Sequence, residues 1–131
     1  MGRFFITAGA VMAFLGVGAG AFAVHGLRGR LDEGMLAVFQ TGAHYQLIHA
    51  LGLILAGLLL QGPLRSGWIR AAGWLLLAGI VLFSFSLYLL AITGISGLGL
   101  ITPFGGLGFL AGWVCLAIGA WRGGGTGNRS V

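Results

Sequence analysis

Hydrophobic residues along the chain form four long runs, separated by short stretches of polar residues, glycine and proline. The runs cover residues 4–24, 36–60, 71–92 and 104–121. Each is close to the roughly 20 residues that an α-helix needs to cross the hydrocarbon core of a bilayer. Because every backbone N–H and C=O group inside lipid must be hydrogen-bonded, such runs are expected to be helical. The pattern predicts an all-α integral membrane protein, a bundle of four transmembrane helices.

Local signals mark where two of these helices begin. Asp32 and Glu33 can cap the positive end of a helix, so the second helix is predicted to begin before Leu36. Thr102 followed by Pro103 is a cap followed by a first-turn proline, which marks the start of the fourth helix. The links between helices are predicted at residues 28–34, 61–70 and 93–103. We expect a four-helix transmembrane domain over residues 1–122 and a flexible cytoplasmic tail over residues 123–131.

Composition supports this class and argues against others. Hydrophobic residues make up 58% of the chain, only 7% are charged, and the mean hydropathy is +1.03, which does not fit the surface of a soluble domain. The net charge of +5 comes from arginines at the ends of the runs, and no basic patch with interleaved aromatic residues suggests nucleic acid. The single cysteine, Cys115, excludes an internal disulfide and a cysteine zinc cluster.

The distribution of arginine predicts the orientation, with both termini in the cytoplasm (N-in/C-in). Five arginines fall on one side of the predicted bundle and two on the other. The five are Arg3, Arg65, Arg70, Arg122 and Arg129, and the two are Arg28 and Arg30. A signal peptide is the competing interpretation of the first run, because Ala21, Phe22 and Ala23 resemble a cleavage site. The run is longer than the usual apolar region of about 7 to 15 residues, so a retained helix is favoured.

Glycine, at 27 of 131 residues, recurs along helical faces. Small-xxx-small spacing lets two helix backbones approach closely where lipid supplies no hydrophobic driving force. The predicted helix-packing glycines are Gly9, Gly16 and Gly20 in the first run, and Gly105, Gly108, Gly112 and Gly119 in the fourth. Packing within the bundle is the favoured interpretation, and a homo-oligomer interface is the alternative.

Polar side chains gather in the half of the bundle that is remote from the termini. Uncompensated polar groups facing lipid cost several kcal/mol each, so their clustering suggests an outward-facing polar pocket between the second and third helices. The candidate pocket residues are Gln40, His44, Tyr45, His49, Ser84 and Tyr88, with His25 and Thr102 at the rim. Each residue also has a simpler explanation, an interhelical hydrogen bond of about 0.6–2 kcal/mol that fixes bundle geometry.

Metal, haem and hydrolase chemistry are each disfavoured. His44 and His49 are five residues apart and diverge by about 140° on a helix, unlike the four-residue spacing of helical zinc ligands. A pair of axial haem ligands would have to come from His25 and His44. The acids are confined to Asp32 and Glu33 at the rim, too far out to complete a serine hydrolase triad. We therefore predict no metal and no cofactor, and enzyme activity is not favoured.

Four stretches carry a resemblance to a known family. These are GAFAVHGL (residues 20–27), FQTGAHYQLIHALGL (39–53), LFSFSLYLLAITG (82–94) and ITPFGGLGFLAGW (101–113). They resemble DUF423, a family of small membrane proteins of unknown function that includes the animal proteins called transmembrane protein 256. The resemblance implies a four-helix protein of the bacterial inner membrane, and it supplies no activity. Its characteristic positions match His25, Tyr45, His49, Ser84, Ser86, Tyr88, Thr102 and Pro103.

Three classes of function follow from these residues. The first is binding or transport of a small polar solute or of protons, with His49 and His44 as titratable groups. The second is an accessory subunit or assembly factor of a larger membrane complex, packing through its glycine-rich helix faces. The third, a membrane enzyme, lacks buried acids and is the least favoured. The lipid bilayer is the one partner that the sequence itself requires.

Overall fold

A computed structural model describes residues 1–123 of the chain. Most of the predicted tail, residues 124–131, lies outside this range, and so does Arg129. The described chain is helical apart from short links. Its elements are α1 (Gly2–Phe22), η1 (Ala23–Leu27), α2 (Glu33–Leu59), α3 (Gly67–Gly79), η2 (Ile80–Phe85), α4 (Ser86–Thr93), η3 (Ser96–Leu100) and α5 (Thr102–Gly123).

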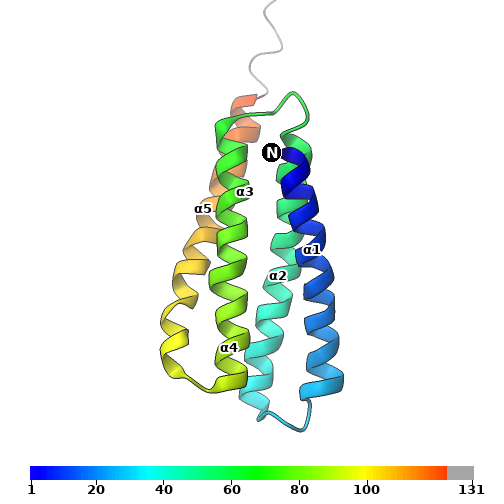
Figure 1. The fold of residues 1–131 in the computed structure, drawn as a ribbon. Coiled ribbons are helices and arrows are strands. Elements are labelled where there is room, and N and C mark those ends of the chain that lie inside the picture. The colour runs from blue at the N-terminus through cyan, green and yellow to red at the C-terminus, as the bar shows by residue number, and fades with distance from the viewer. Residues whose placement is uncertain (124–131) are drawn as a thin grey trace, which may run out of the picture.

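These elements combine into four continuous helical stretches long and apolar enough to cross a membrane, as the sequence predicts. They cover Gly2–Leu27, Glu33–Leu59, Gly67–Thr93 and Ser96–Gly123. Successive stretches run up and down, so residue 1 and the end of α5 lie at the same end of the bundle (Figure 1). We call this the terminal end, and the other the hairpin end. α1 packs mainly on α2, and α5 packs mainly on α3 and η2, with α2 contacting α3, η2 and α4 between them.

Both predicted helix starts are confirmed. α2 begins at Glu33, and the Asp32 carboxylate accepts a hydrogen bond of 2.8 Å from the backbone N–H of Met35. α5 begins at Thr102, with Pro103 in its first turn. The predicted link over residues 93–103 is more ordered than expected, because it contains the short 3₁₀-helix η3. Gly94 ends α4 with a φ of 70°, a conformation that glycine adopts without steric cost.

Two helix pairs approach closely at glycine. A Cβ atom on Gly9 of α1 would lie 2.8 Å from the carbonyl oxygen of Ala50 in α2, so no larger residue fits there without movement. Gly105 of α5 lies against the backbone of η2 at Phe83 in the same way. Gly16 packs on α2, and Gly108, Gly112 and Gly119 pack on α3. Gly20 differs from the expectation, since a Cβ atom there would have nothing within 4 Å.

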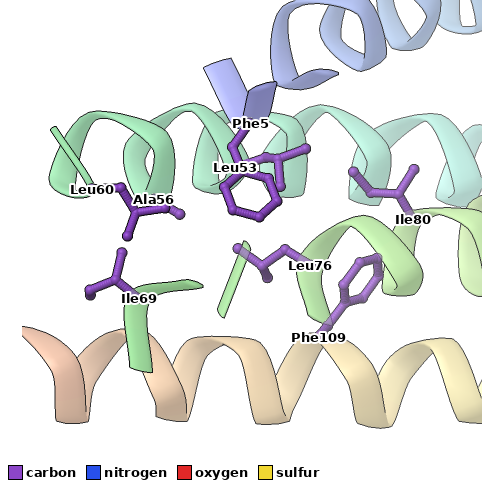
Figure 2. Close-up of a cluster of buried hydrophobic side chains, with 8 residues drawn as sticks. All are labelled: Phe5, Leu53, Ala56, Leu60, Ile69, Leu76, Ile80 and Phe109. Atoms are coloured by element: carbon purple, nitrogen blue, oxygen red, sulfur yellow. The ribbon is translucent and has the colours of Figure 1, made fainter. Parts of the chain in front are cut away.

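The largest apolar core lies toward the terminal end, where all four spans contribute (Figure 2). Phe5 of α1, Leu53 of α2 and Leu76 of α3 are fully buried in it. The other members are Ala56, Leu60, Ile69, Ile80 and Phe109. A smaller cluster of Ala23, Leu27, Phe39 and Ala91 lies toward the hairpin end. The difference leaves polar side chains to supply part of the contact between helices in that half.

Candidate functional site

A buried glutamine joins three of the spans. Gln46 of α2 is fully buried, and its Nε2 donates a hydrogen bond of 2.8 Å to the backbone carbonyl of Met12 in α1. Its Oε1 accepts a hydrogen bond of 2.6 Å from the Tyr88 hydroxyl in α4. Both functional groups of the amide are therefore satisfied, as a buried polar side chain requires. The predicted pocket residue Tyr88 therefore connects α4 to α2 through its hydroxyl group.

Gln46 is absent from the sequence-based candidates, although the sequence carried a signal for it. The buried face of α2 follows alternating steps of three and four residues through Phe39, Ala43, Gln46, Ala50 and Leu53. A polar residue in phase with that stripe must enter the bundle. Gln46 lies at the same depth in α2 as the candidates Tyr45 and His49, so its position on this stripe is the signal that identifies it.

A second set of polar groups joins α4 to α5. The Ser86 hydroxyl donates to the backbone carbonyl of Phe83 at 2.9 Å, one turn back along the helix. Its oxygen lies 2.7 Å from Oγ1 of Thr102. Since the single Ser86 proton is directed to Phe83, the Thr102 hydroxyl is the donor in this contact. The predicted rim residue Thr102 therefore connects the start of α5 to the start of α4 through a hydrogen bond.

The hydroxyl of Ser84 has no hydrogen-bond partner within the part of the chain that the structure describes. Its side chain is fully buried in η2, a turn of π-helix between α3 and α4. Among residues 1–123, Ser84 Oγ is the one sealed side-chain polar atom without a hydrogen bond. Such an atom costs about 1–3 kcal/mol. Ser84 is close to Gly42 of α2, where a Cβ atom would lie 3.1 Å from the Ser84 carbonyl oxygen.

The pocket in this region lies between α2, η2 and α5 and has a volume of about 650 Å³. We call it the aromatic pocket. Its walls include Tyr45, His49, Phe83, Pro103, Phe109 and Trp113, together with Gly106, Leu107 and Leu110. Most of this surface is apolar, and Tyr45, His49 and Trp113 are the lining residues whose side chains carry a polar atom. The volume is in the range of known small-molecule sites.

His49 is fixed at the wall of the aromatic pocket by two contacts. Its ring stacks on Phe109, with ring centroids 3.5 Å apart and planes 10° apart. Its Nδ1 lies 2.6 Å from the backbone carbonyl oxygen of Tyr45. A carbonyl oxygen only accepts, so Nδ1 carries the proton and Nε2 is an acceptor in the neutral ring. Nε2 has no partner among the described residues and is not one of their sealed atoms, and His49 is a lining residue of the pocket.

The sequence-predicted residues fall into four groups in the structure. Tyr45 and His49 line the aromatic pocket, Ser84 lies behind it in η2, and Tyr88 and Thr102 serve the links between helices. Gln40 and His44 are exposed on the outer surface of α2, and His25 is exposed in η1. The structure thus does not bring Gln40 or His44 together with His49. His44 and His49 are five residues apart, so their side chains point about 140° apart around the helix axis. His44 therefore lies on the outer surface of α2 and His49 lies inside the bundle.

No group of three or more His, Cys, Asp or Glu side chains within residues 1–123 is arranged to hold a metal ion. The hydrogen bonds of the described region also form separate sets, around Gln46, around Ser86 and at His49. They do not form one continuous chain along the bundle. The chemistry that this arrangement offers is therefore stacking on aromatic rings with one fixed acceptor at His49.

Comparison with known proteins places the chain in a family. The profile of a protein family of unknown function, DUF423, matches residues 19–106. The chain belongs to the DUF423 family. It is 47% identical over 118 residues to the UPF0382 membrane protein YwdK of Bacillus subtilis, covering 90% of this chain and 96% of the relative. It is 45% identical over 121 residues to the UPF0382 membrane protein SH2409 of Staphylococcus haemolyticus, covering 92% and 97% respectively.

A third relative, the UPF0382 membrane protein SAB0533 of Staphylococcus aureus, is 41% identical over 121 residues, which are 92% of this chain and 97% of the relative. No solved structure matches the chain. The names of these relatives and the four spans agree that this is a multi-pass membrane protein. The family description gives no activity, so a function has to be argued from the residues of this chain.

Proposed function

We propose that this protein binds a small lipid-soluble molecule in the aromatic pocket, with a ring-borne hydroxyl group as the feature that is recognised. The observation that carries the proposal is the stack of His49 on Phe109, which leaves Nε2 as a fixed acceptor in a pocket with an apolar lining. A ring stacks on the aromatic walls, and its hydroxyl donates to Nε2. Tyr45, whose side chain is partly exposed, supplies a second polar group at the wall.

This ligand class fits the lining better than the small polar solute that the sequence suggested. A solute that is hydrated in water needs several hydrogen bonds to replace its water shell. The lining offers polar atoms on three side chains, those of Tyr45, His49 and Trp113, and the nearby amide of Gln46 has both of its functional groups engaged. Proton conduction would need a relay of groups along the bundle, and the separate hydrogen-bonded sets do not supply one.

The proposed placement in the cell follows from charge. Arg3, Arg65, Arg70 and Arg122 lie at the terminal end and only Arg28 and Arg30 at the hairpin end, which supports an N-in/C-in topology in the bacterial cytoplasmic membrane. The aromatic pocket then lies nearer the outer leaflet. Labelling of single cysteines placed at Arg28 and Arg65 with a membrane-impermeant reagent in intact cells tests this topology. We expect labelling at position 28 only.

Ligand binding is testable through the fluorescence of Trp113, a wall of the pocket. The probes are 4-bromo-1-naphthol and 1-bromonaphthalene, two quenchers that differ in the hydroxyl group, added to protein in an uncharged detergent. We expect both to quench, with the naphthol binding about 5- to 10-fold more tightly because of one hydrogen bond. His49→Phe keeps the stacking ring and removes the acceptor, so it should abolish the difference between the probes. A Trp113→Phe variant identifies the signal that belongs to the pocket.

A matched pair of glycine variants tests whether binding occurs in the pocket. A Cβ atom on Gly106 would meet nothing closer than Phe83 Cδ2 at 3.9 Å, so Gly106→Leu fills the pocket without a clash at the backbone. Gly18 of α1 has open space around it and lies elsewhere, so Gly18→Leu is the control. Quenching of Trp113 should be lost in Gly106→Leu and kept in Gly18→Leu. Unchanged binding in Gly106→Leu would remove the proposal.

A second candidate function rests on the outer surface of α2. Gln40 and His44 are exposed there. The helix that carries them is about 40 Å long, which is more than the roughly 30 Å thickness of the bilayer core. Polar side chains at that depth pair with protein in preference to lipid. We infer that another membrane protein covers this surface, so that the chain acts as an accessory subunit. The glycines Gly9 and Gly105 are engaged inside the bundle and do not serve this contact.

Native mass spectrometry after extraction in a gentle detergent tests the accessory role. We expect a heteromeric species from wild-type cells and its loss in the Gln40→Leu, His44→Leu double variant. Val114→Ala, at an exposed position of α5 away from this surface, is the control that should leave the species intact. A single monomeric species from wild-type cells would contradict this second candidate and leave the aromatic pocket unaffected.

A further inference from the structure

A second cavity lies at the terminal end of the bundle, on the opposite side of the apolar core from the hydrogen-bonded groups. Its volume is about 610 Å³. Three arginines line it: Arg3 from the first turn of α1, Arg70 from the first turn of α3, and Arg65 from the link between α2 and α3. Gln61 and the backbone of Gly2 and Gly62 complete much of the lining. We call it the cationic cavity.

The charge of the cationic cavity is not balanced by acidic side chains. The chain has two of them, Asp32 and Glu33, and both are at the hairpin end, a helix length of about 40 Å away along α2. Arg122 is at the same end as the cavity but lies over the ring of Trp68, 5.7 Å from its centroid. The three lining arginines thus place their positive charges around one space with no carboxylate of a side chain to neutralise them.

Two of the helix ends at the cavity, the N-termini of α1 and α3, add to this positive potential, while the C-terminal end of α2 at Leu60 offsets one of them. α1 and α3 both begin here, and the N-terminus of a helix carries about half a positive charge. Neither helix has an acidic residue in its first turn, and each has an arginine in or beside it instead. That arrangement is the reverse of the one that stabilises a helix, so it favours an anion as the missing partner. An excess of arginine at one membrane face does not by itself require three of them to line one cavity.

Close packing holds the two sides of the cavity in place. A Cβ atom on Gly2 would lie 2.7 Å from the carbonyl oxygen of Gly57, and one on Gly57 would lie 2.7 Å from that of Gly2. The start of α1 is therefore pressed against the end of α2, beside Gln61. Arg65 lies in the link that follows Gln61. Its backbone N–H donates a hydrogen bond of 3.2 Å to the carbonyl oxygen of Gly62. The positions of the arginine-bearing segments are set by these backbone contacts.

We propose that the cationic cavity binds a phosphate group, with Arg3, Arg65 and Arg70 donating to its oxygens. Guanidinium groups match phosphate oxygens through two parallel N–H donors, and a dianion or a phosphodiester offers several acceptors to three arginines at once. Because the cavity opens at the membrane surface, the phosphate comes from either of two sources: the headgroup of an anionic lipid or a soluble phosphate compound. The aromatic pocket takes no part in this site.

The test uses the full-length protein and two probes. The first is inorganic phosphate, titrated in an uncharged detergent at constant ionic strength with chloride as the replacement, and followed by the thermal unfolding temperature. The second is phosphatidylglycerol, measured by native mass spectrometry as lipid retained from nanodiscs of phosphatidylcholine containing phosphatidylglycerol. Retained phosphatidylglycerol without a phosphate effect identifies the lipid headgroup, and a phosphate effect identifies the soluble source. Binding of neither probe to the wild type overturns the proposal.

Matched charge variants separate this site from general attraction to positive charge. Arg65→Gln should weaken binding about tenfold, the effect of losing one charge-assisted hydrogen bond. Arg65 lies in an exposed link, so folding is little affected. Arg28→Gln makes the same change in net charge at the hairpin end and should leave binding unchanged. Equal loss in the two variants would show nonspecific attraction and would overturn the assigned site. Gly106→Leu, which fills the aromatic pocket, should not alter phosphate binding.

Discussion

The two halves of the bundle are closed by different interactions, although the same four spans run through both. Toward the terminal end, Phe5, Leu53 and Leu76 fill the space between helices with apolar side chains. Toward the hairpin end, the apolar cluster is smaller, and Gln46 and Tyr88 link the helices through hydrogen bonds. Lipid is as apolar as leucine, so burial alone drives little association in either half. Close packing of side chains holds the helices together toward the terminal end, and hydrogen bonds between polar side chains do much of this toward the hairpin end.

This difference explains where an opening is possible. Close helix contact at glycine leaves little space between backbones in the terminal half, as at Gly9. Where large aromatic side chains such as Phe109 and Trp113 separate the helices, the packing leaves the aromatic pocket between α2 and α5. The π-helical turn η2 falls at this boundary and brings Phe83 to the pocket wall. π-turns of this kind are frequent at functional sites.

The largest expected effect comes from overfilling a glycine contact. In Gly9→Leu the new side chain meets the carbonyl of Ala50, so we expect the free energy of unfolding to fall by about 3 kcal/mol. Gly20→Leu, on the same helix but with open space around it, should change stability by less than about 0.5 kcal/mol. Titration with sodium dodecyl sulfate in mixed micelles measures both. A similar loss of stability in the two variants would show that the close contact between Gly9 and α2 does not determine the cost of a larger side chain.

A smaller loss is expected when the polar link is removed. Gln46→Leu leaves the Tyr88 hydroxyl without its acceptor, and we expect a loss of about 2 kcal/mol. Adding Tyr88→Phe removes the orphaned hydroxyl, so the double variant should recover part of the loss, with a coupling energy of about 1 kcal/mol. The same detergent titration completes the double-mutant cycle. Strict additivity of the two losses would mean that the bond contributes nothing to closing this half.

The smallest effects should differ in sign at two serines. Ser86→Ala removes a hydroxyl that bonds Phe83 and Thr102, so we expect a loss of about 1 kcal/mol. Ser84→Ala removes a sealed hydroxyl that has no partner, so stability should stay unchanged or rise by up to about 1 kcal/mol. Parallel thermal unfolding of the two variants makes the comparison. A marked loss in Ser84→Ala would reveal a partner for that hydroxyl, such as a bound water.

Much of the architecture follows from local properties of the chain. The apolar runs alone predict the four spans, because a helix is the way a single segment satisfies its backbone in lipid. The cap residue Asp32 and the pair Thr102 and Pro103 mark two helix starts to within a few residues, because these signals lie next to the helix ends that they specify. The polar residues Tyr45, His49, Ser84 and Tyr88 could likewise be selected, since polar groups in a span are rare and costly.

What those residues do depends on partners distant in the sequence. Whether His44 or His49 faces the interior is decided by the rotation of α2 against α3 and α5, and Gln46 gains its role from Met12 and Tyr88, 34 and 42 residues away. The space beside Phe109 likewise exists only because three helices meet there. The chain alone therefore determines the number of spans and where helices begin. The tertiary structure decides which side chains meet, because packing sets the rotation and separation of helices, which local sequence leaves open.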